Sequence, residues 1–503
     1  MPFSGDERTV RLLLQLAPYE EGEDSMGFGI AAPKLSLLTD NQFDCLYGNS
    51  IELLNSIGLK IEHEEMLNTL KGEGCTVDGE IVRFPGDLVE RCIKSTPKSI
   101  NIFNRNGEIA LKLNREVSYF GAGVGAPFLL EAFDGKRKPF TKSDVAEAAI
   151  IQDALPNIDF VMGVGEISDI VNVYTADVHQ FHALVCNTTK PINFMTTNTQ
   201  STYNVIEMAA IIVGGEDKLR EKPFIFLFGV GPTPPLHYVK GKLDRFCIAI
   251  DKGIPIVSLS AAGSGGTAPV TLAGHIVMSL SEILGAVVMA QTRREGAPIV
   301  VGGMPLTMDM KTATFSYGAP EFHLANTAIS EILFRLNLPS YGTGGVSDSK
   351  TVDEQAAIEC TASTYFQVLS KTDLIHDIGF IDSVLVGSYE SLVINNEIIS
   401  MIKRFCSGFQ IDNEHLAIDT IAKVGHGGNY IMEPHTIRHF RKELWMPSLF
   451  SRDNFAKWSQ LGSQPLRERA KKRVSEILAT HRPQPLDNVI KKKIDEILLN
   501  RSD

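Results

Sequence analysis

Apolar and β-branched residues recur along this chain in short runs, and each run is followed by a segment long enough for a helix. One such segment is KSDVAEAAIIQDAL at residues 142–155, and another spans residues 271–294. Strand-like runs that alternate with helical segments are typical of βα units, which build a parallel sheet. The runs are VSYFGAG (117–123), FVMGVG (160–165), INFMTTN (192–198), PFIFLFGV (223–230), PIVSLSAA (255–262), PIVVGGMP (298–305), LPSYGTGG (338–345) and LIHDIGFI (374–381).

Eight consecutive βα units followed by a stop predict an α/β fold of the (β/α)8 TIM-barrel type. An open doubly wound sheet is the alternative, and it fits the strand count less well. Nearly every run ends in glycine or another small residue, which suits a place where the backbone approaches a ligand. Sites in TIM barrels are built from the loops after the strands, so we expect the site at that end.

Two further segments flank the predicted barrel of residues 117–408. Residues 1–116 predict an N-terminal mixed α/β extension, with two helices and a small β element after residue 40. Residues 409–503 predict a C-terminal helical extension, whose basic last part (466–503) has the pattern of an amphipathic surface helix. A solvated helix face explains these basic residues better than a nucleic-acid site does.

Composition and charge narrow the class of protein. The chain has 503 residues, of which 44% are hydrophobic, so it can bury a large core. Its net charge of −12 argues against generic binding to nucleic acid or to an anionic membrane. The longest apolar stretch, near Ile283–Ala290, is far shorter than the ~20 residues of a membrane span. Seven cysteines without paired spacing suit reduced thiols, so we expect a cytoplasmic enzyme with neither nucleic-acid nor membrane partners.

Three glycine-rich loops, at residues 121–127, 229–235 and 263–269, invite comparison with phosphate-binding motifs. They have neither the GxGxxG spacing of a dinucleotide site nor the GK[ST] of a P-loop. Since each follows a predicted strand, close backbone approach at a barrel mouth is the better interpretation. We therefore expect no bound nucleotide.

Two histidine pairs have the spacing that places both rings on one helix face. His179 and His182 are three residues apart, and His435 and His439 are four apart. Neither pair lies in an HExxH pattern or beside a cysteine, and surface or core histidines are the commoner outcome. We therefore expect no tightly bound metal.

A group of aromatic and acidic residues is predicted at the ends of the later strands and in the loops after them. Aromatic faces together with carboxylates suit an organic cation, because a quaternary ammonium has no donor hydrogen and binds through cation–π and Coulomb attraction. Asp377 and Glu166 are further acidic residues in the same region. The candidate substrate-binding residues are Phe228, Tyr317, Glu321, Tyr341, Asp348 and His376.

Several long stretches of the chain resemble the trimethylamine methyltransferase family of corrinoid-dependent enzymes. They are residues 57–85, 302–321, 341–359, 378–402 and VGHGGNYIMEPHTIRHFRKELWMPSLFSRDNFAKW at 424–458, and together they span almost the full length. The resemblance implies a TIM barrel that passes a methyl group from an amine to the Co(I) corrinoid of a cognate partner protein. It also implies that cobalamin arrives on that partner, that this chain holds no tightly bound cofactor, and that the protein is a homo-oligomer.

In the founding trimethylamine enzymes, a pyrrolysine lies in the region that residues 341–350 resemble. The residues from Tyr341 to Ser347 are all ordinary ones, so the chain resembles the non-pyrrolysine branch. Members of that branch demethylate quaternary amines such as glycine betaine, proline betaine or carnitine. When a quaternary ammonium loses a methyl group, its leaving group is already a neutral amine and needs no proton donor, whereas a tertiary amine must first be quaternised. The resemblance thus predicts a quaternary amine substrate.

Two other functions remain as alternatives. A TIM-barrel lyase or aldolase needs a Schiff-base lysine or a metal-held carboxylate set at the strand ends, but the nearest lysines, Lys311 and Lys350, are predicted in loops. Lys311 is instead a weaker candidate for binding the carboxylate of the substrate. A non-catalytic betaine-binding protein is the second alternative, and it would need no docking surface for a corrinoid protein.

Overall fold

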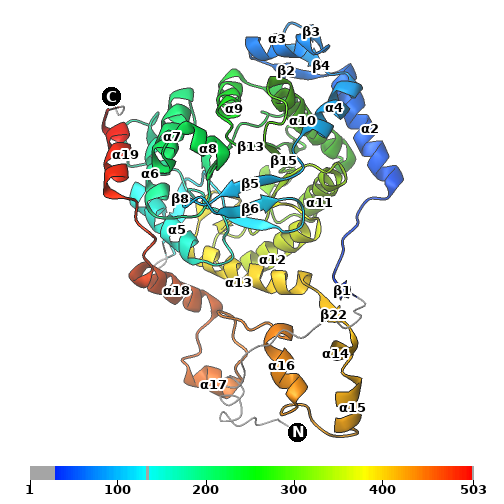
Figure 1. The fold of residues 1–503 in the computed structure, drawn as a ribbon, viewed down its shortest axis with the longest axis vertical. Coiled ribbons are helices and arrows are strands. Elements are labelled where there is room, and N and C mark those ends of the chain that lie inside the picture. The colour runs from blue at the N-terminus through cyan, green and yellow to red at the C-terminus, as the bar shows by residue number, and fades with distance from the viewer. Residues whose placement is uncertain (1–28, 132–134, 501–503) are drawn as a thin grey trace.

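A barrel of parallel strands lies at the centre of the molecule and is surrounded by helices (Figure 1). The computed structural model describes residues 29–131 and 135–500. Seven strands form one sheet in the order β10-β11-β13-β15-β18-β19-β7, and every neighbouring pair is parallel. These strands are β7 (Tyr119–Ala122), β10 (Ile192–Met195), β11 (Ile225–Phe228), β13 (Ile256–Ser260), β15 (Ile299–Gly303), β18 (Ser340–Thr343) and β19 (Leu374–Ile378).

A short eighth segment closes the barrel between β7 and β10. Gly121 is bridged in parallel to Phe160, and Val161 is bridged in parallel to Ile192. A side chain on Gly121 would collide with the Phe160 ring, since its Cβ would lie 2.1 Å from a ring carbon, so glycine is required for this closure. Val164 then takes a left-handed conformation (φ 60°), which ends the extended segment. The predicted TIM barrel is confirmed, with one of its eight predicted strands reduced to this two-residue segment.

An outer ring of helices follows the strands in the order that the sequence pattern predicts. Many of these helices begin at a residue whose side chain caps the helix, such as Thr141, Asn198, Asp353 and Ser388. Short polar residues after a strand therefore set where each helix starts. The helices are α5 (Lys142–Ala154), α6 (Ala176–Cys186), α7 (Thr199–Val213), α8 (Glu216–Glu221), α9 (Lys240–Lys252), α10 (Leu272–Arg293), α11 (Pro320–Arg335), α12 (Glu354–Leu369) and α13 (Tyr389–Cys406).

Helix α10 is long and apolar enough to cross a membrane by length and composition alone. Its most apolar window has a mean hydropathy of 1.7, but 78% of that window is buried inside the protein. It packs against strands β13 and β15 on one side and against α2 (Asp40–Ser56) and α4 (Gly86–Ser95) on the other. Its apolar character is therefore explained by burial between the barrel and the N-terminal extension.

The N-terminal extension covers two parts of the barrel. A small sheet made of β2 (Leu59–Ile61), β3 (Thr76–Asp78) and β4 (Ile81–Arg83), with α3 (Glu64–Gly72) beside it, pairs through β2 with β12 (His237–Tyr238) in the loop after β11. A hairpin of β5 (Ile100–Phe103) and β6 (Ile109–Leu113) lies across the amino ends of the strands. Its backbone N–H groups donate hydrogen bonds to the carbonyls of Thr189 and Pro223, which precede β10 and β11. The opposite end is left for the mouth. Residues 1–28 of the predicted extension lie outside the described residues.

The C-terminal extension is helical apart from one short strand, β22 (Phe409–Ile411), which pairs with β1 (Gly29–Ala31). Helices α18 (Leu466–Thr480) and α19 (Asn488–Asn500) pack on the barrel helices α13, α5, α6 and α7. Residues 409–465, here called the C-terminal lobe, lie to one side of the barrel (Figure 1). The helices of this lobe, all within the described part of the chain, contain no buried residue. They are α14 (Asn413–Leu416), α15 (Ile418–Val424), α16 (Pro434–Glu443) and α17 (Phe455–Gln460).

Candidate active site at the mouth of the barrel

The loops after the barrel strands form the rim of the mouth, and they carry small sheets of their own. One sheet, in the order β20-β21-β8-β9, joins the loops that follow β19 and β7. A second, in the order β14-β16-β17, joins the loops that follow β13 and β15. Since both sheets lie beyond the carboxyl ends of the strands, they surround the place where TIM-barrel sites are found. Their strands are β8 (Phe128–Leu130), β9 (Arg137–Pro139), β14 (Gly263–Ser264), β16 (Leu306–Asp309), β17 (Thr314–Ser316), β20 (Phe380–Ile381) and β21 (Val386–Gly387).

Three rings that the sequence nominated come together inside the barrel. The Tyr341 ring lies 4.5 Å from the His376 ring and 5.7 Å from the Phe228 ring, measured between centroids, and Phe228 lies 5.6 Å from His376. Tyr341 and His376 are fully buried, whereas Phe228 is only half-buried. Phe228 is therefore the member of this ring cluster that is most accessible to a ligand.

Polar groups fix the orientation of the rings. The Tyr341 hydroxyl donates to the side-chain oxygen of Asn193 at 2.8 Å, and the Asn193 amide donates to the Phe226 carbonyl at 2.9 Å. The His376 Nε2 atom lies 3.0 Å from the Thr343 hydroxyl. The rings are thus held by packing and by hydrogen bonds, one of which joins β18 to the non-adjacent strand β10, and this preorganises the cluster.

Asp377 places a carboxylate beside the ring cluster. Its Oδ1 atom lies 2.8 Å from Nδ1 of His376, and both side chains are almost fully buried. Asp377 has a φ of 71°, and the register of β19 with β7 shifts between Ile375 and Ile378, so the carboxylate lies at a strand irregularity next to His376. Gly123 provides the space, because a Cβ there would lie 2.4 Å from Oδ1 of Asp377.

Tyr317 lies on the loop between β17 and α11, close to the same acidic group. Its ring packs 5.5 Å from that of Phe322, and it is 6% exposed. Burial, followed by the negative charges of Asp377 and Asp348, raises the pKa of Tyr317 above its ordinary value. Burial likewise raises the pKa of Tyr341 well above its ordinary value. Both phenols therefore keep their protons.

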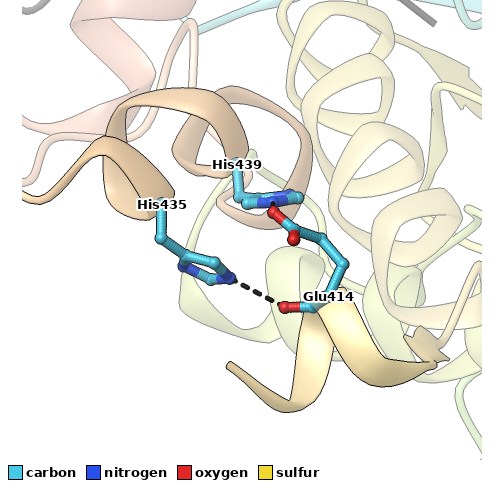
Figure 2. Close-up of side chains that lie close together, drawn as sticks. All are labelled: Glu414, His435 and His439. Carbon is cyan, nitrogen blue, oxygen red and sulfur yellow. Dashed lines mark hydrogen bonds and ion pairs between the residues drawn. The ribbon is translucent and has the colours of Figure 1, made fainter. Parts of the chain in front are cut away.

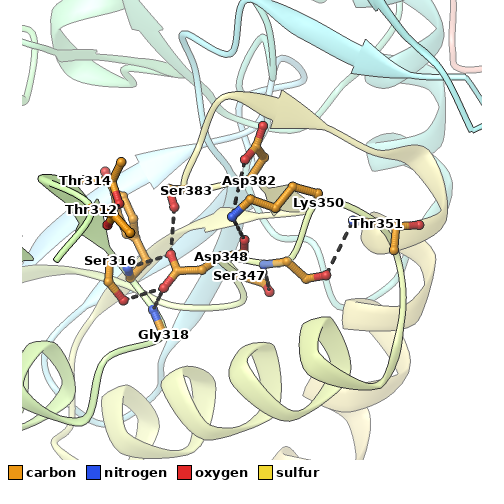
Figure 3. A network of polar contacts seen from close by, with 12 residues as sticks. Thr312, Thr314, Ser316, Gly318, Ser347, Asp348, Lys350, Thr351, Asp382 and Ser383 are labelled. Atoms are coloured by element: carbon orange, nitrogen blue, oxygen red, sulfur yellow. Dashed lines mark hydrogen bonds and ion pairs between the residues drawn. The ribbon is translucent and has the colours of Figure 1, made fainter. Parts of the chain in front are cut away.

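Asp348 binds loops together rather than presenting a free carboxylate (Figure 3). It accepts hydrogen bonds from the Ser316 hydroxyl, from the backbone N–H groups of Tyr317 (2.8 Å) and Gly318 (3.0 Å), and from the Ser383 hydroxyl (2.8 Å). These donors belong to the loops after β15 and β19, while Asp348 itself follows β18. The carboxylate thereby fixes the segment that carries Tyr317.

Glu282 plays a comparable part behind β13. From α10 it accepts hydrogen bonds from the Ser260 hydroxyl at 2.5 Å and from the Leu236 N–H group at 2.6 Å. Burial raises the pKa of Glu282 to about 7. This side chain anchors the loop between β11 and α9, which begins directly after Phe228.

The structure brings some of the six predicted site residues together and leaves others apart. Phe228, Tyr341 and His376 form one cluster, and Tyr317 adjoins it through Asp377, whereas Asp348 acts through the loops. Glu321 is exposed on the first turn of α11 and is not part of the ring cluster. Sequence reasoning did not nominate Asn193 or Thr343, and the signal available for both was their position on strands next to residues that it did nominate.

The first histidine pair has separate partners. His179 lies 3.1 Å from the Lys142 ammonium, and His182 lies 2.6 Å from Asp495 on α19. Burial and the charge of Lys142 lower the pKa of His179 to about 4. Both histidines therefore tie helices of the outer ring together.

Comparison with known proteins shows to which family the chain is similar. The sequence matches the family described as "Trimethylamine methyltransferase (MTTB)" over residues 24–503. It is 32% identical over 480 residues to the trimethylamine methyltransferase MttB of Desulfitobacterium hafniense (strain DSM 10664 / DCB-2), covering 95% of each chain. It is 28% identical over 475 residues to the glycine betaine methyltransferase of Desulfitobacterium hafniense (strain Y51), covering 94% of this chain and 98% of that protein.

A solved structure supports the fold. The monomethylamine methyltransferase MtmB of Methanosarcina barkeri superposes with a TM-score of 0.50 at 10% identity, over 88% of this chain and 89% of that one. At this identity the likeness concerns the fold alone. The sequence match, by contrast, extends over almost the whole chain and includes a relative above 30% identity, which shows a methyltransferase. The chain belongs to the trimethylamine methyltransferase family.

Proposed function

We propose that the protein demethylates a quaternary amine of the glycine betaine type and passes the methyl group to the Co(I) corrinoid of a separate partner protein. The observation that carries this proposal is the ring cluster of Phe228, Tyr341 and His376 at the mouth, with the Asp377 carboxylate beside it. Aromatic faces bind a trialkylammonium head, which offers no N–H group, and a nearby carboxylate adds long-range attraction. A glycine betaine methyltransferase among the relatives supports the same substrate class.

The side chains suit a transfer that requires no acid. The corrinoid in its Co(I) state supplies the electron pair for the new bond to the methyl carbon, while the pair of the broken C–N bond stays on the departing neutral amine. Because no proton is transferred, Tyr317 and Tyr341 can remain protonated, as their raised pKa values require. The work of the protein is to orient the methyl group and to remove water from the cation.

Negative charge that does not contact the substrate cation directly also favours turnover. A site that bound the cation too strongly would stabilise the ground state, because the positive charge leaves the nitrogen as the methyl group departs. The Asp348 carboxylate is occupied by four loop donors, so its charge acts through the surroundings rather than by contact. Aromatic faces then provide most of the contact with the cation.

The lyase or aldolase alternative finds little support in Lys350 and Lys311, the lysines nearest the predicted site. Lys350 is exposed, and its ammonium donates to the Asp348 carbonyl at 2.6 Å and lies 3.6 Å from Asp382. Lys311 is exposed in the turn between β16 and β17. A Schiff-base lysine is normally desolvated so that its pKa falls, and neither residue has that environment.

A methyl-transfer assay tests the proposal and distinguishes an enzyme from a binding protein. The purified protein is incubated with a reduced corrinoid protein and, in turn, with glycine betaine, proline betaine, carnitine or trimethylamine. We expect loss of the Co(I) absorption together with a stoichiometric amount of the demethylated amine for at least one quaternary amine, and no reaction with trimethylamine. Tight binding of a betaine without demethylation would support the binding protein, and reaction with trimethylamine alone would overturn the proposed substrate class.

A further inference from the structure

The second histidine pair lies in the C-terminal lobe, outside the barrel and its mouth. His435 and His439 are one turn apart on the same face of α16, and Glu414 of α14 faces them (Figure 2). One potential ligand atom from each of these three residues lies within 4.8 Å of the other two. The sequence offered only the pair, and the fold adds the carboxylate from more than 20 residues earlier in the chain.

The three side chains already make polar contacts with one another. The Glu414 Oε1 atom lies 2.9 Å from Nε2 of His439, and Nε2 of His435 lies 3.1 Å from the Glu414 backbone carbonyl. Arg438 also contacts Oε1 of Glu414, at 2.8 Å. A cation bound here would replace these contacts, because a ring nitrogen that donates to Glu414 must release its proton before it can act as a ligand.

A third imidazole adjoins the group and is oriented by a carboxylate. The His415 ring lies 5.0 Å from the His439 ring, and its Nδ1 atom lies 2.7 Å from Oδ1 of Asp412. On its other side, Nε2 of His415 lies 3.9 Å from Oε1 of Glu443. Carboxylate–histidine pairs of this kind orient imidazoles for metal ligation in known sites.

The helices of the lobe have little apolar core of their own, and polar contacts such as those of Glu397 with Ser448 and of Arg404 with Glu443 join the lobe to α13. Helices α14 to α17, all described, contain no buried residue, so a hydrophobic core contributes little to their arrangement. In small units of this kind a structural metal supplies folding free energy that a core would otherwise provide. Two imidazoles four residues apart and a facing carboxylate match the ligand types of zinc.

The geometry points to a metal site: Glu414, His435 and His439 bind a divalent transition-metal ion of the zinc type, and the ion ties α14 to α16. Imidazole ligands favour such ions over Mg²⁺ and Ca²⁺, which prefer oxygen. The site is independent of methyl transfer. The proposal departs from the expectation from the sequence that these are surface or core histidines and that no metal is tightly bound.

Metal titration of the full-length protein tests the site. The protein is stripped with EDTA, dialysed, and titrated with Zn²⁺ by calorimetry and with Co²⁺ by visible absorption. We expect one equivalent of either ion to bind at pH 7.5, no competition from Mg²⁺, and weaker binding at pH 5.5 because the imidazoles are then protonated. The metal should also raise the melting temperature, since it binds the folded lobe.

Three variants make the test specific. His435→Ala combined with His439→Ala should weaken Zn²⁺ binding by about tenfold or more and abolish the rise in melting temperature, and Glu414→Gln should weaken binding while keeping the shape of the side chain. His426→Ala is the matched control, because His426 is exposed in the same lobe and should leave binding unchanged. Absence of stoichiometric binding in the wild-type protein, undiminished affinity in both ligand variants, or an equal loss in His426→Ala would overturn the proposal.

Discussion

Replacing Phe228 by leucine isolates the contribution of one aromatic face to substrate binding. Phe228 is the half-buried member of the ring cluster, and its centroid lies 5.7 Å from that of Tyr341 and 5.6 Å from that of His376. Leucine keeps an apolar side chain at the same place but has no π face. A cation over one ring gains about 0.5–2 kcal/mol, so the Kd for glycine betaine should rise by about 2- to 30-fold.

Calorimetry with a charge-free isostere makes this measurement decisive. In 3,3-dimethylbutyrate a carbon atom replaces the nitrogen of glycine betaine, so the shape and the carboxylate are kept and the positive charge is lost. The wild-type protein should prefer glycine betaine, and Phe228→Leu should reduce that preference by about the same 2- to 30-fold factor. An unchanged ratio of the two affinities in Phe228→Leu would refute cation–π binding by this ring.

Tyr341→Phe is the matched control, because it keeps the ring and removes only the hydroxyl. The buried hydrogen bond to Asn193 is lost, which should lower the free energy of unfolding by about 1–3 kcal/mol. Its affinity for glycine betaine should change by less than about 2-fold, since the aromatic face remains. Alanine at Tyr341 or Tyr317 is a poorer test, because these side chains are only 1% and 6% exposed and truncation would leave a cavity.

Three further predictions concern the surroundings of the site. Glu282 loses its proton above its ordinary pKa of 4.5 in the unfolded chain, but keeps it up to about pH 7 in the folded protein. Between these two pH values the free energy of unfolding should therefore fall by about 3 kcal/mol as the pH rises. Urea unfolding of Glu282→Gln at several pH values should lack this fall. A Glu282→Gln profile that still parallels the wild type would assign the fall to other groups. Asp348→Ala should lower the free energy of unfolding by about 2 kcal/mol or more and expose the β16–β17 hairpin to proteolysis, because four donors lose their acceptor. A hairpin that stays intact under limited proteolysis would contradict this. Gly123→Ala should lower stability by about 1–3 kcal/mol and reduce methyl transfer, because its Cβ would lie 2.1 Å from the Phe380 ring and 2.4 Å from Oδ1 of Asp377. Wild-type activity in this variant would argue that the position of that carboxylate does not matter for the reaction.

The barrel could be predicted from the sequence because its cause is local. Runs such as residues 298–305 are apolar on both sides, and they recur between helical segments that begin at residues such as Thr141 and Ser388. Parallel strands buried on both faces need just this pattern, and eight such units in succession favour a closed barrel over an open sheet. The weak point was the strand at residues 160–165, which Val164 ends early through its left-handed backbone, a feature that no apolar pattern encodes.

The directions of the side chains at the mouth were decided by tertiary structure. Tyr341 and His376 meet because β18 and β19 are neighbours whose register pairs His376 with Thr343, two residues along from Tyr341, whereas Glu321, on the first turn of a helix, is left exposed. Asp377 reaches the ring cluster through an irregularity in β19. Asp348 finds its donors on two loops that lie 30 or more residues away, one earlier and one later in the chain.

The same division explains the C-terminal lobe. The spacing of His435 and His439 is a local property of one helix, so the sequence shows that the two rings can share a face. Whether a third ligand stands opposite depends on how α14 is placed against α16, and that placement is a long-range contact. Helical and strand periodicity depends on residues that are neighbours in the sequence, so the sequence shows it. A site needs residues that are distant in the sequence, and only the folded chain brings them together.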